Sequence, residues 1–178
     1  DSEAAESSAA ISDSAAVDSA ERAYSMAAGM PSLRLYTDDF PLTALYHLET
    51  ILSQARSKTV WLKSGGNLVI EPTEALTVID VNTAKNVSKK TSEETYLKTN
   101  LEAAEEIAVQ LRLRNLSGII IVDFIDMKEE ESRKTLLAAL RRAVTADPVK
   151  TILVDMTPLG LVELTRKKIR RPLHEQVR

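Results

Sequence analysis

The sequence predicts an α/β or α+β protein, in which a mixed β-sheet is flanked by helices. Short apolar runs alternate with longer segments whose apolar residues recur at helical spacing, which is typical of a sheet covered by helices. The runs at 118–124 and 151–154 are nearly continuous, as expected for buried strands. With 178 residues, 44% of them hydrophobic, the chain is long enough to form one sizeable core.

The N-terminal part is expected to be irregular at first and then helical. Residues 1–13 are rich in Ser and Ala and have almost no large apolar side chains, so burial cannot offset the entropy lost on ordering them. The Ala-rich segment 14–30 favours a helix, which Gly29 and Pro31 would end. A short strand is predicted at 33–36.

A second helical segment is predicted to begin at Pro41, because proline is favoured in the first turn of a helix. Its apolar residues recur at helical spacing and are expected to bury one face: Leu45, Leu48, Ile51 and Leu52. The first part of the chain is therefore predicted to alternate between helix and strand.

A β-hairpin and a third strand are predicted next. Residues 59–62 and 68–71 are short β-prone runs, and the segment between them contains Gly65-Gly66, which is typical of a hairpin turn. The third strand is expected at 75–81, followed by a polar, lysine-containing loop at 86–91.

The second half of the chain is expected to alternate between long helices and strands. A helix is predicted at about 92–114, then a strand at 118–124, a helix at 129–145 and a strand at 151–154. The apolar stripe of the first helix is Leu97, Leu101, Ala104, Ala108 and Leu111, and that of the second is Leu136, Leu137, Leu140 and Val144.

Three of the apolar strands end in aspartate, at Asp80, Asp123 and Asp155. Carboxylates at the carboxyl ends of neighbouring strands meet at one edge of a sheet, where open α/β folds place their ligands. Asp80 and Asn82 are two residues apart, so both project from the same face of their strand and can reach one ion. Asp123 can supply the second carboxylate. Two carboxylates and an amide suit Mg²⁺, which prefers oxygen ligands and accepts a phosphate oxygen. Such an ion can polarise a phosphodiester and orient a water for in-line attack, which would leave 5′-phosphate and 3′-hydroxyl ends.

Each of these aspartates also has a simpler interpretation, as a helix cap or the start of a loop. That interpretation suits Asp155 better, because Met156-Thr157-Pro158 follows it and no second polar group accompanies it. Asp126 is placed to cap the helix that begins near Glu129. The run Glu129-Glu130-Glu131 is most simply the acidic first turn of that helix.

The composition excludes several kinds of site. The absence of cysteine excludes a disulfide framework and a thiolate zinc site, and two histidines far apart in sequence argue against a histidine-built metal centre. The sequence contains no apolar run of membrane-spanning length and no secretory signal at its N-terminus, so we expect a cytoplasmic protein without a membrane span.

The net charge of −3 argues only weakly against nucleic-acid binding, because the charge is unevenly distributed. The first 31 residues carry six acidic side chains and one arginine, so the rest of the chain is mildly basic. The densest basic cluster, at 166–171, suits a phosphate backbone, although such a run is as often a solvated surface. The candidate RNA contacts are Arg112, Arg114, Arg166, Lys167 and Lys168.

Four ordered blocks of the sequence resemble the catalytic region of the ribonuclease E/G family. They are Glu74-Ala-Leu-Thr-Val-Ile-Asp-Val-Asn-Thr, Thr99-Asn-Leu-Glu-Ala-Ala-Glu-Glu-Ile-Ala, Gln110-Leu-Arg-Leu-Arg-Asn-Leu and Gly118-Ile-Ile-Ile-Val-Asp-Phe-Ile-Asp-Met. The resemblance covers about residues 33 to 171. It implies that Asp80 and Asp123 hold a catalytic Mg²⁺, for which Mn²⁺ is a possible substitute, and that Asn82 assists.

The resemblance also implies a division of the chain. Residues 58–178 would form a catalytic subdomain similar in fold to deoxyribonuclease I, and residues 1–57 a partial ribonuclease-H-like α/β subdomain with a poorly ordered N-terminal edge. Full-length members also carry an OB-type RNA-binding domain, a pocket that senses the 5′ end, and a cysteine pair that links subunits through zinc. The chain therefore resembles an excised or truncated core, and zinc is expected only in a full-length protein.

The function implied by the resemblance is magnesium-dependent endonucleolytic cleavage of single-stranded, often AU-rich RNA. In the family this cleavage is stimulated by a 5′-monophosphate and serves ribosomal RNA maturation and messenger decay, and a homo-oligomer is possible. The alternative is a truncated, catalytically weak RNA-binding or assembly module of the same family. RNA affinity scales with the number of phosphates contacted, so the missing domains would remove much of the binding.

Overall fold

The computed structural model describes residues 35–83 and 93–176. The predicted irregular segment 1–13, the helix at 14–30 and the loop at 86–91 lie outside the described residues. The chain divides into two compact units, Asp1–Tyr46 and His47–Arg178.

The smaller unit contains one short helix among its described residues, α2 (Leu42–Leu45). Pro41 starts this helix as predicted, and its carbonyl accepts the backbone N–H of Leu45 at 2.9 Å. Residues 35 and 36 are not in a strand, so the strand predicted at 33–36 is wrong over its described part.

The larger unit begins with α3 (Leu48–Arg56). The single helix that the spacing predicts is interrupted at His47, whose φ of 49° lies in the left-handed region. The predicted burial of this helical face is wrong, because all four of its apolar residues are 39% to 45% exposed: Leu45, Leu48, Ile51 and Leu52. Helical spacing identifies an apolar face, but it does not supply a partner to cover that face.

The larger unit is built on a six-stranded mixed sheet, which confirms the predicted sheet class. Its order is β1-β2-β3-β4-β6-β5, and β3 and β4 run parallel while every other neighbouring pair is antiparallel. The strands are β1 (Thr59–Trp61), β2 (Asn67–Pro72), β3 (Leu76–Asn82), β4 (Gly118–Asp123), β5 (Thr151–Met156) and β6 (Leu161–Arg166).

The predicted hairpin joins β1 to β2 and packs against the end of β3. The backbone N–H of Leu62 donates to the carbonyl of Gly66 at 2.8 Å and so closes the turn. A Cβ at Gly66 would lie 2.6 Å from the carbonyl oxygen of Asn82, which is closer than any side chain tolerates. Gly66 is therefore required for the hairpin to approach β3.

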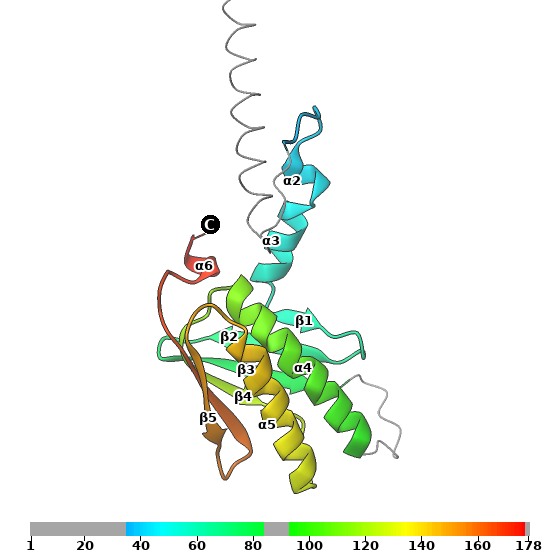
Figure 1. The fold of residues 1–178 in the computed structure, drawn as a ribbon, viewed down its shortest axis with the longest axis vertical. Coiled ribbons are helices and arrows are strands. Elements are labelled where there is room, and N and C mark those ends of the chain that lie inside the picture. Colours follow the sequence, from blue (N-terminus) through cyan, green and yellow to red (C-terminus); the bar gives the residue numbers. More distant parts are fainter. Residues whose placement is uncertain (1–34, 84–92, 177–178) are drawn as a thin grey trace, which may run out of the picture. The chain divides into compact units, whose positions relative to one another are not determined.

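Two long helices lie side by side on one face of the sheet (Figure 1). They are α4 (Glu93–Leu113), which connects the parallel strands β3 and β4, and α5 (Glu130–Thr145). The predicted bounds of both helices agree with the observed ones within one or two residues. Fully buried side chains from the helices and the sheet form one core between them, including Ile79, Ile107, Leu111, Val122, Leu136, Leu140 and Leu164.

The apolar stripe predicted for α4 is confirmed only in part. Ala104, Ala108 and Leu111 are buried, whereas Leu97 and Leu101 are half-buried. The helix instead adds Ala103 and Ile107 to the core, together with polar residues such as Asn100.

The last strands form a second hairpin, of which the sequence predicted only the first strand. β5 extends to Met156, beyond the predicted end at residue 154, and β6 was not predicted. Gly160, with φ of +84°, allows the turn between them. A short helix, α6 (Leu173–Gln176), follows, and the backbone N–H of Leu173 donates to the carbonyl of Arg114 at 2.9 Å.

Within residues 35–83 and 93–176, no helix has the length and apolarity needed to cross a membrane.

Candidate functional site

Asp80 and Asp123 lie side by side at the carboxyl ends of β3 and β4. They are direct register partners in the parallel pair of strands. Neighbouring strands lie about 4.8 Å apart and paired residues point to the same face, so the two carboxylates share one position on the sheet. With Asn82, two residues further along β3, they form what we call the strand-end site.

The alternation of apolar and polar residues decides which face of the sheet carries this site. Ile79, Val81 and Val122 are at most 5% exposed and belong to the core beneath α4 and α5. Side chains alternate along a strand, so the residues of the strand-end site point to the opposite face, which these helices do not cover (Figure 1).

Asn82 is in direct contact with Asp80. Its side-chain Nδ2 donates to Asp80 Oδ2 at 2.8 Å, and both residues are half-buried. This hydrogen bond fixes the orientation of the carboxylate and uses one of its oxygens. The amide oxygen of Asn82 and the second oxygen of Asp80 are the acceptor atoms that this contact does not use.

The electrostatics of the site are dominated by negative charge. Partial desolvation of its carboxyl group, and then repulsion from the carboxylates of Asp80 and Asp126, raise the pKa of Asp123 above its ordinary value. Asp126 therefore belongs to the electrostatic surroundings of the site, three residues after Asp123 in the segment that leaves β4.

The cap predicted for Asp126 is wrong. The N-cap of α5 is Glu129, and this cap makes no side-chain hydrogen bond. The predicted acidic first turn is confirmed, since Glu130 and Glu131 occupy it. Asp126 lies too far before the helix to cap it, and its charge acts on Asp123 instead.

Asp155 is not part of the strand-end site. It lies on the edge strand β5, which β6 separates from β4. Its Oδ1 accepts the backbone N–H of Met156 at 2.8 Å. Asp155 therefore lies inside a strand, one residue before its end, and neither caps a helix nor joins the strand-end site.

The donor set of the strand-end site suits a hard divalent cation. Carboxylate and amide oxygens are the protein ligands that Mg²⁺ prefers, and a cation would relieve the repulsion among the carboxylates. Among the described residues, no three acidic, histidine or cysteine side chains lie close enough to form a metal site on their own. A cation here would therefore take the rest of its ligands from water and substrate, as Mg²⁺ usually does.

Asn100 is a positioning residue that sequence reasoning missed. It is fully buried on α4, and its side chain makes two hydrogen bonds with the backbone of Ile125: Nδ2 donates to the carbonyl at 2.8 Å, and Oδ1 accepts the N–H at 3.1 Å. These bonds hold the segment between Asp123 and Asp126. The signal in the sequence was a polar residue inside the apolar part of a predicted helix.

Glu102 is a second positioning residue, which holds the β1–β2 hairpin through hydrogen bonds to its backbone. Its carboxylate accepts the backbone N–H groups of Lys63 and Ser64. Burial acts to raise its pKa, but hydrogen bonds from Ser64 and Lys63 outweigh this effect and leave the pKa below its ordinary value. Since the hairpin packs against the carbonyl of Asn82, Glu102 indirectly supports the strand-end site.

The five candidate RNA contacts fall into two groups. Arg112, Lys167 and Lys168 are exposed, so a nucleic acid can reach them from solvent. Arg114 and Arg166 are only 6% and 4% exposed, and their guanidinium groups hydrogen-bond to the protein itself. The structure thus gives these two arginines internal contacts, while RNA binding at the three exposed cations stays a prediction.

Comparison with known proteins agrees with the blocks noted in the sequence. The sequence model of the Ribonuclease E/G family matches residues 3–169. The chain is 47% identical over 138 residues to a Ribonuclease G of Salmonella typhimurium and 48% identical over 141 residues to one of Haemophilus influenzae. It is 44% identical over 140 residues to a Ribonuclease E of a Nostoc species.

These alignments cover most of this chain but a minor part of each relative. They include 78% or 79% of the chain, but only 28%, 29% and 20% of the three relatives. The chain thus spans less than a third of the length of the curated relatives that it matches.

Proposed function

This chain belongs to the ribonuclease E/G family, and from that premise we propose that it forms the catalytic core of a magnesium-dependent endoribonuclease. We further propose that residues 58–178 adopt a deoxyribonuclease-I-like fold and that residues 1–57 are part of a ribonuclease-H-like subdomain. The mixed sheet covered by helices is compatible with the first of these assignments.

The observation that carries the proposal is the register pairing of Asp80 with Asp123. It brings two carboxylates together on a sheet face that α4 and α5 leave open. Desolvation, and then repulsion from Asp80 and Asp126, raise the pKa of Asp123, and a bound cation would relieve that repulsion. When bound, Mg²⁺, or Mn²⁺ in its place, would polarise the phosphodiester and activate a water.

The residues of the site have distinct proposed roles. Asp80 and Asp123 hold the cation through their carboxylate oxygens. Asn82 orients Asp80 through the 2.8 Å hydrogen bond and offers its amide oxygen to a water or to the cation. The products would carry 5′-phosphate and 3′-hydroxyl ends.

The proposed substrate is single-stranded RNA, in the context of ribosomal RNA processing and messenger decay in the cytoplasm. The names of the relatives, Ribonuclease G and Ribonuclease E, support an RNA substrate. Arg112, Lys167 and Lys168 are the proposed backbone contacts, because they are the candidate cations that lie at the surface. Association of two copies of the chain is part of the proposal, and a zinc link is proposed only for a longer protein.

The test is cleavage of a short single-stranded RNA with Mg²⁺ and with a chelator, using the chain and its Asp80→Asn and Asp123→Asn variants. Asp155→Asn is the matched control, because it makes the same change at another strand-end aspartate outside the site. We expect metal-dependent cleavage by the chain and the control, and loss of cleavage in the two site variants. Equal cleavage by all four proteins would reject the site.

The second candidate function is a catalytically weak RNA-binding or assembly module. It is favoured by the three exposed cations Arg112, Lys167 and Lys168, which can contact an RNA backbone without any part in cleavage. Binding of the same RNA, without metal-dependent cleavage by any of the four proteins, would select this module over the endonuclease core.

A further inference from the structure

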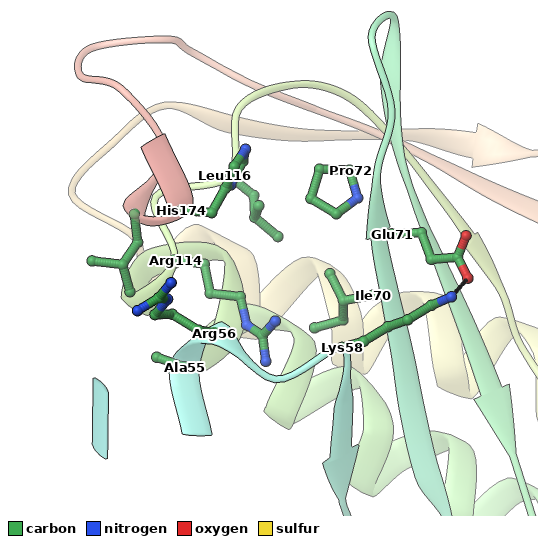
Figure 2. Close-up of a pocket in the computed structure, with 10 residues that line it drawn as sticks. Ala55, Arg56, Lys58, Ile70, Glu71, Pro72, Arg114, Leu116 and His174 are labelled. Carbon is green, nitrogen blue, oxygen red and sulfur yellow. Dashed lines mark ion pairs between the residues drawn. The ribbon is translucent and has the colours of Figure 1, made fainter. Parts of the chain in front are cut away.

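The larger unit contains a cavity that is separate from the strand-end site. Its volume is about 380 Å³, within the range of roughly 300–1,000 Å³ that is typical of small-ligand pockets. It is lined by the ends of α3 and β2, the turn after α4, and α6 (Figure 2). Pro72 on its wall pairs with Thr77 at the start of β3, whereas Asp80 and Asn82 lie toward the other end of that strand.

Arg114 is the central charged group of this cavity. It is only 6% exposed, and two hydrogen bonds fix its guanidinium: Nε donates to Gln110 Oε1 at 2.7 Å, and Nη1 donates to the carbonyl of Ser57 at 2.6 Å. The remaining nitrogen, Nη2, is buried without a hydrogen-bond partner in the described part of the chain. The group is therefore held in one orientation, while Nη2, which carries two N–H donors, is unused.

An unused buried donor on a cation is unfavourable, because the group has lost its hydration without replacing it. No carboxylate among the described residues forms an ion pair with Arg114. Burial lowers its pKa and the charge of Glu106 partly opposes this, but a guanidinium stays protonated at neutral pH. A bound anion would satisfy both the donor and the charge.

Two further cations line the same cavity. Figure 2 shows the Arg114 guanidinium between Arg56 and Lys58. Lys58 forms an ion pair with Glu71, so Arg56 and Arg114 are the two lining cations that form no ion pair among the described residues. A phosphate monoester carries about −1.5 to −2 charges at neutral pH, which matches two cations better than the single charge of a carboxylate does.

The remaining wall is apolar. Ile70 and Leu116 are each 2% exposed, and Pro72 and Leu173 line the cavity beside them. A purely ionic ligand such as inorganic phosphate would leave this surface without contacts. The cavity therefore favours a phosphate that is attached to an organic group.

We propose that this cavity binds the phosphate group of a nucleotide, with Arg114 and Arg56 holding the phosphate while Ile70, Pro72 and Leu116 pack against the attached nucleoside. The phosphate can be the monoester of a free mononucleotide or a phosphodiester of an RNA chain, and the diester should bind more weakly because it carries a single charge. The site is independent of the strand-end site and of any metal.

The experiment is calorimetric titration of the full chain with four probes: adenosine 5′-monophosphate, adenosine, inorganic phosphate, and a short single-stranded RNA with a 5′-hydroxyl end. We expect saturable binding of adenosine 5′-monophosphate, with adenosine and inorganic phosphate each weaker by about tenfold or more. RNA that competes with adenosine 5′-monophosphate would identify an RNA chain as a source of the phosphate. RNA that does not compete would assign the site to free mononucleotides.

Three variants locate the binding. Arg114→Gln and Arg56→Gln should each weaken binding of adenosine 5′-monophosphate, the first by about tenfold or more. Arg56 is exposed, so its replacement tests the site even if Arg114→Gln does not fold. Arg133→Gln removes the same charge from the surface of α5 and should leave the affinity unchanged.

Two results would overturn the proposal. One is the absence of saturable binding of adenosine 5′-monophosphate to the chain, or binding no tighter than that of adenosine. The other is an affinity that Arg56→Gln and any folded Arg114 variant leave unchanged. The Asp80→Asn variant should bind adenosine 5′-monophosphate normally, so failure of the strand-end proposal and failure of this one are distinguishable.

Discussion

Arg166 and Asp147 form an ion pair in the interior of the larger unit. Arg166 Nε donates to Asp147 Oδ2 at 2.7 Å, and each side chain is only 3% exposed. Nη1 of Arg166 also donates to Asn115 Oδ1 and to the carbonyl of Leu116, both at 3.0 Å. One arginine on β6 thus joins the segment before β5 to the turn after α4.

We expect Asp147→Asn to lower the free energy of unfolding by about 3–5 kcal/mol, because buried Arg166 would lose its counter-charge. Urea denaturation measures the change. The control is Glu130→Gln: Glu130 pairs with Lys134 at 2.8 Å, but both side chains are mostly exposed, so the loss there should not exceed about 0.5 kcal/mol. If the two variants lost the same free energy of unfolding, the buried ion pair would not have the stabilising role given to it here.

The same ion pair predicts a dependence of stability on pH. Burial acts to raise the pKa of Asp147, but hydrogen bonding and charge from Arg166 outweigh it, so the pKa lies below its ordinary value. An acid with a lowered folded-state pKa contributes stability above its unfolded-state pKa and loses it as the pH falls through the folded-state pKa. Between about pH 5 and pH 2, the wild-type chain should therefore lose more stability than Asp147→Asn. The measurement is urea denaturation of both proteins at several pH values. If their free energies of unfolding fell in parallel as the pH is lowered, the ion pair would not be the cause of the pH dependence.

Asp123→Asn should raise stability slightly in metal-free buffer. An acid whose folded-state pKa is raised costs stability when it is ionised, and Asn removes both the desolvation of the charge and its repulsion from Asp80 and Asp126. Asp123 is exposed, so solvent screening limits the gain to a few tenths of a kcal/mol, on the order of a surface charge pair. Excess Mg²⁺ should raise the melting temperature of the wild type but not of the variant. Asp155→Asn is the control and should respond to Mg²⁺ as the wild type does.

Gly66→Ala should destabilise the chain by about 2 kcal/mol, because the new methyl group would overlap the carbonyl of Asn82 and force the hairpin away from β3. It should also slow RNA cleavage if the strand-end site is catalytic. Gly118→Ala is the matched comparison: its φ is +86°, but a Cβ there meets nothing within 4 Å, so only backbone strain of about 1 kcal/mol is expected. Thermal unfolding and cleavage rates measure both effects, and a larger loss in Gly118→Ala would contradict the proposed clash.

Asn100→Ala should cost about 2 kcal/mol, because both backbone groups of Ile125 would lose their partner on α4. The segment from Asp123 to Asp126 would then be less well held, so cleavage should slow more than stability alone explains. Lys98→Ala, on an exposed position of the same helix, is the control. Hydrogen exchange of the Ile125 amide reports the change directly, and unchanged exchange would exclude the positioning role.

The elements with strong local signals could be predicted. α4 and α5 have apolar residues at helical spacing and acidic first turns, and both properties belong to short stretches of sequence. β6 could not be found in the same way, because Glu163 and Arg166 interrupt its apolar pattern. Arg166 is buried only because Asp147, nineteen residues earlier, neutralises it. The apolar face of α3 shows the opposite case, in which a correct local pattern did not lead to burial.

The sequence by itself determined that Asp80, Asn82 and Asp123 stand at strand ends, and that the first two share a face. Both statements depend only on the two-residue period of a single strand. The tertiary structure alone decided that Asp123 pairs directly with Asp80, that Asp126 adds its charge, and that Arg114 and Arg166 are internal. The physical reason is that register, burial and charge pairing depend on contacts between residues far apart in the chain, and a local pattern carries no information about those contacts.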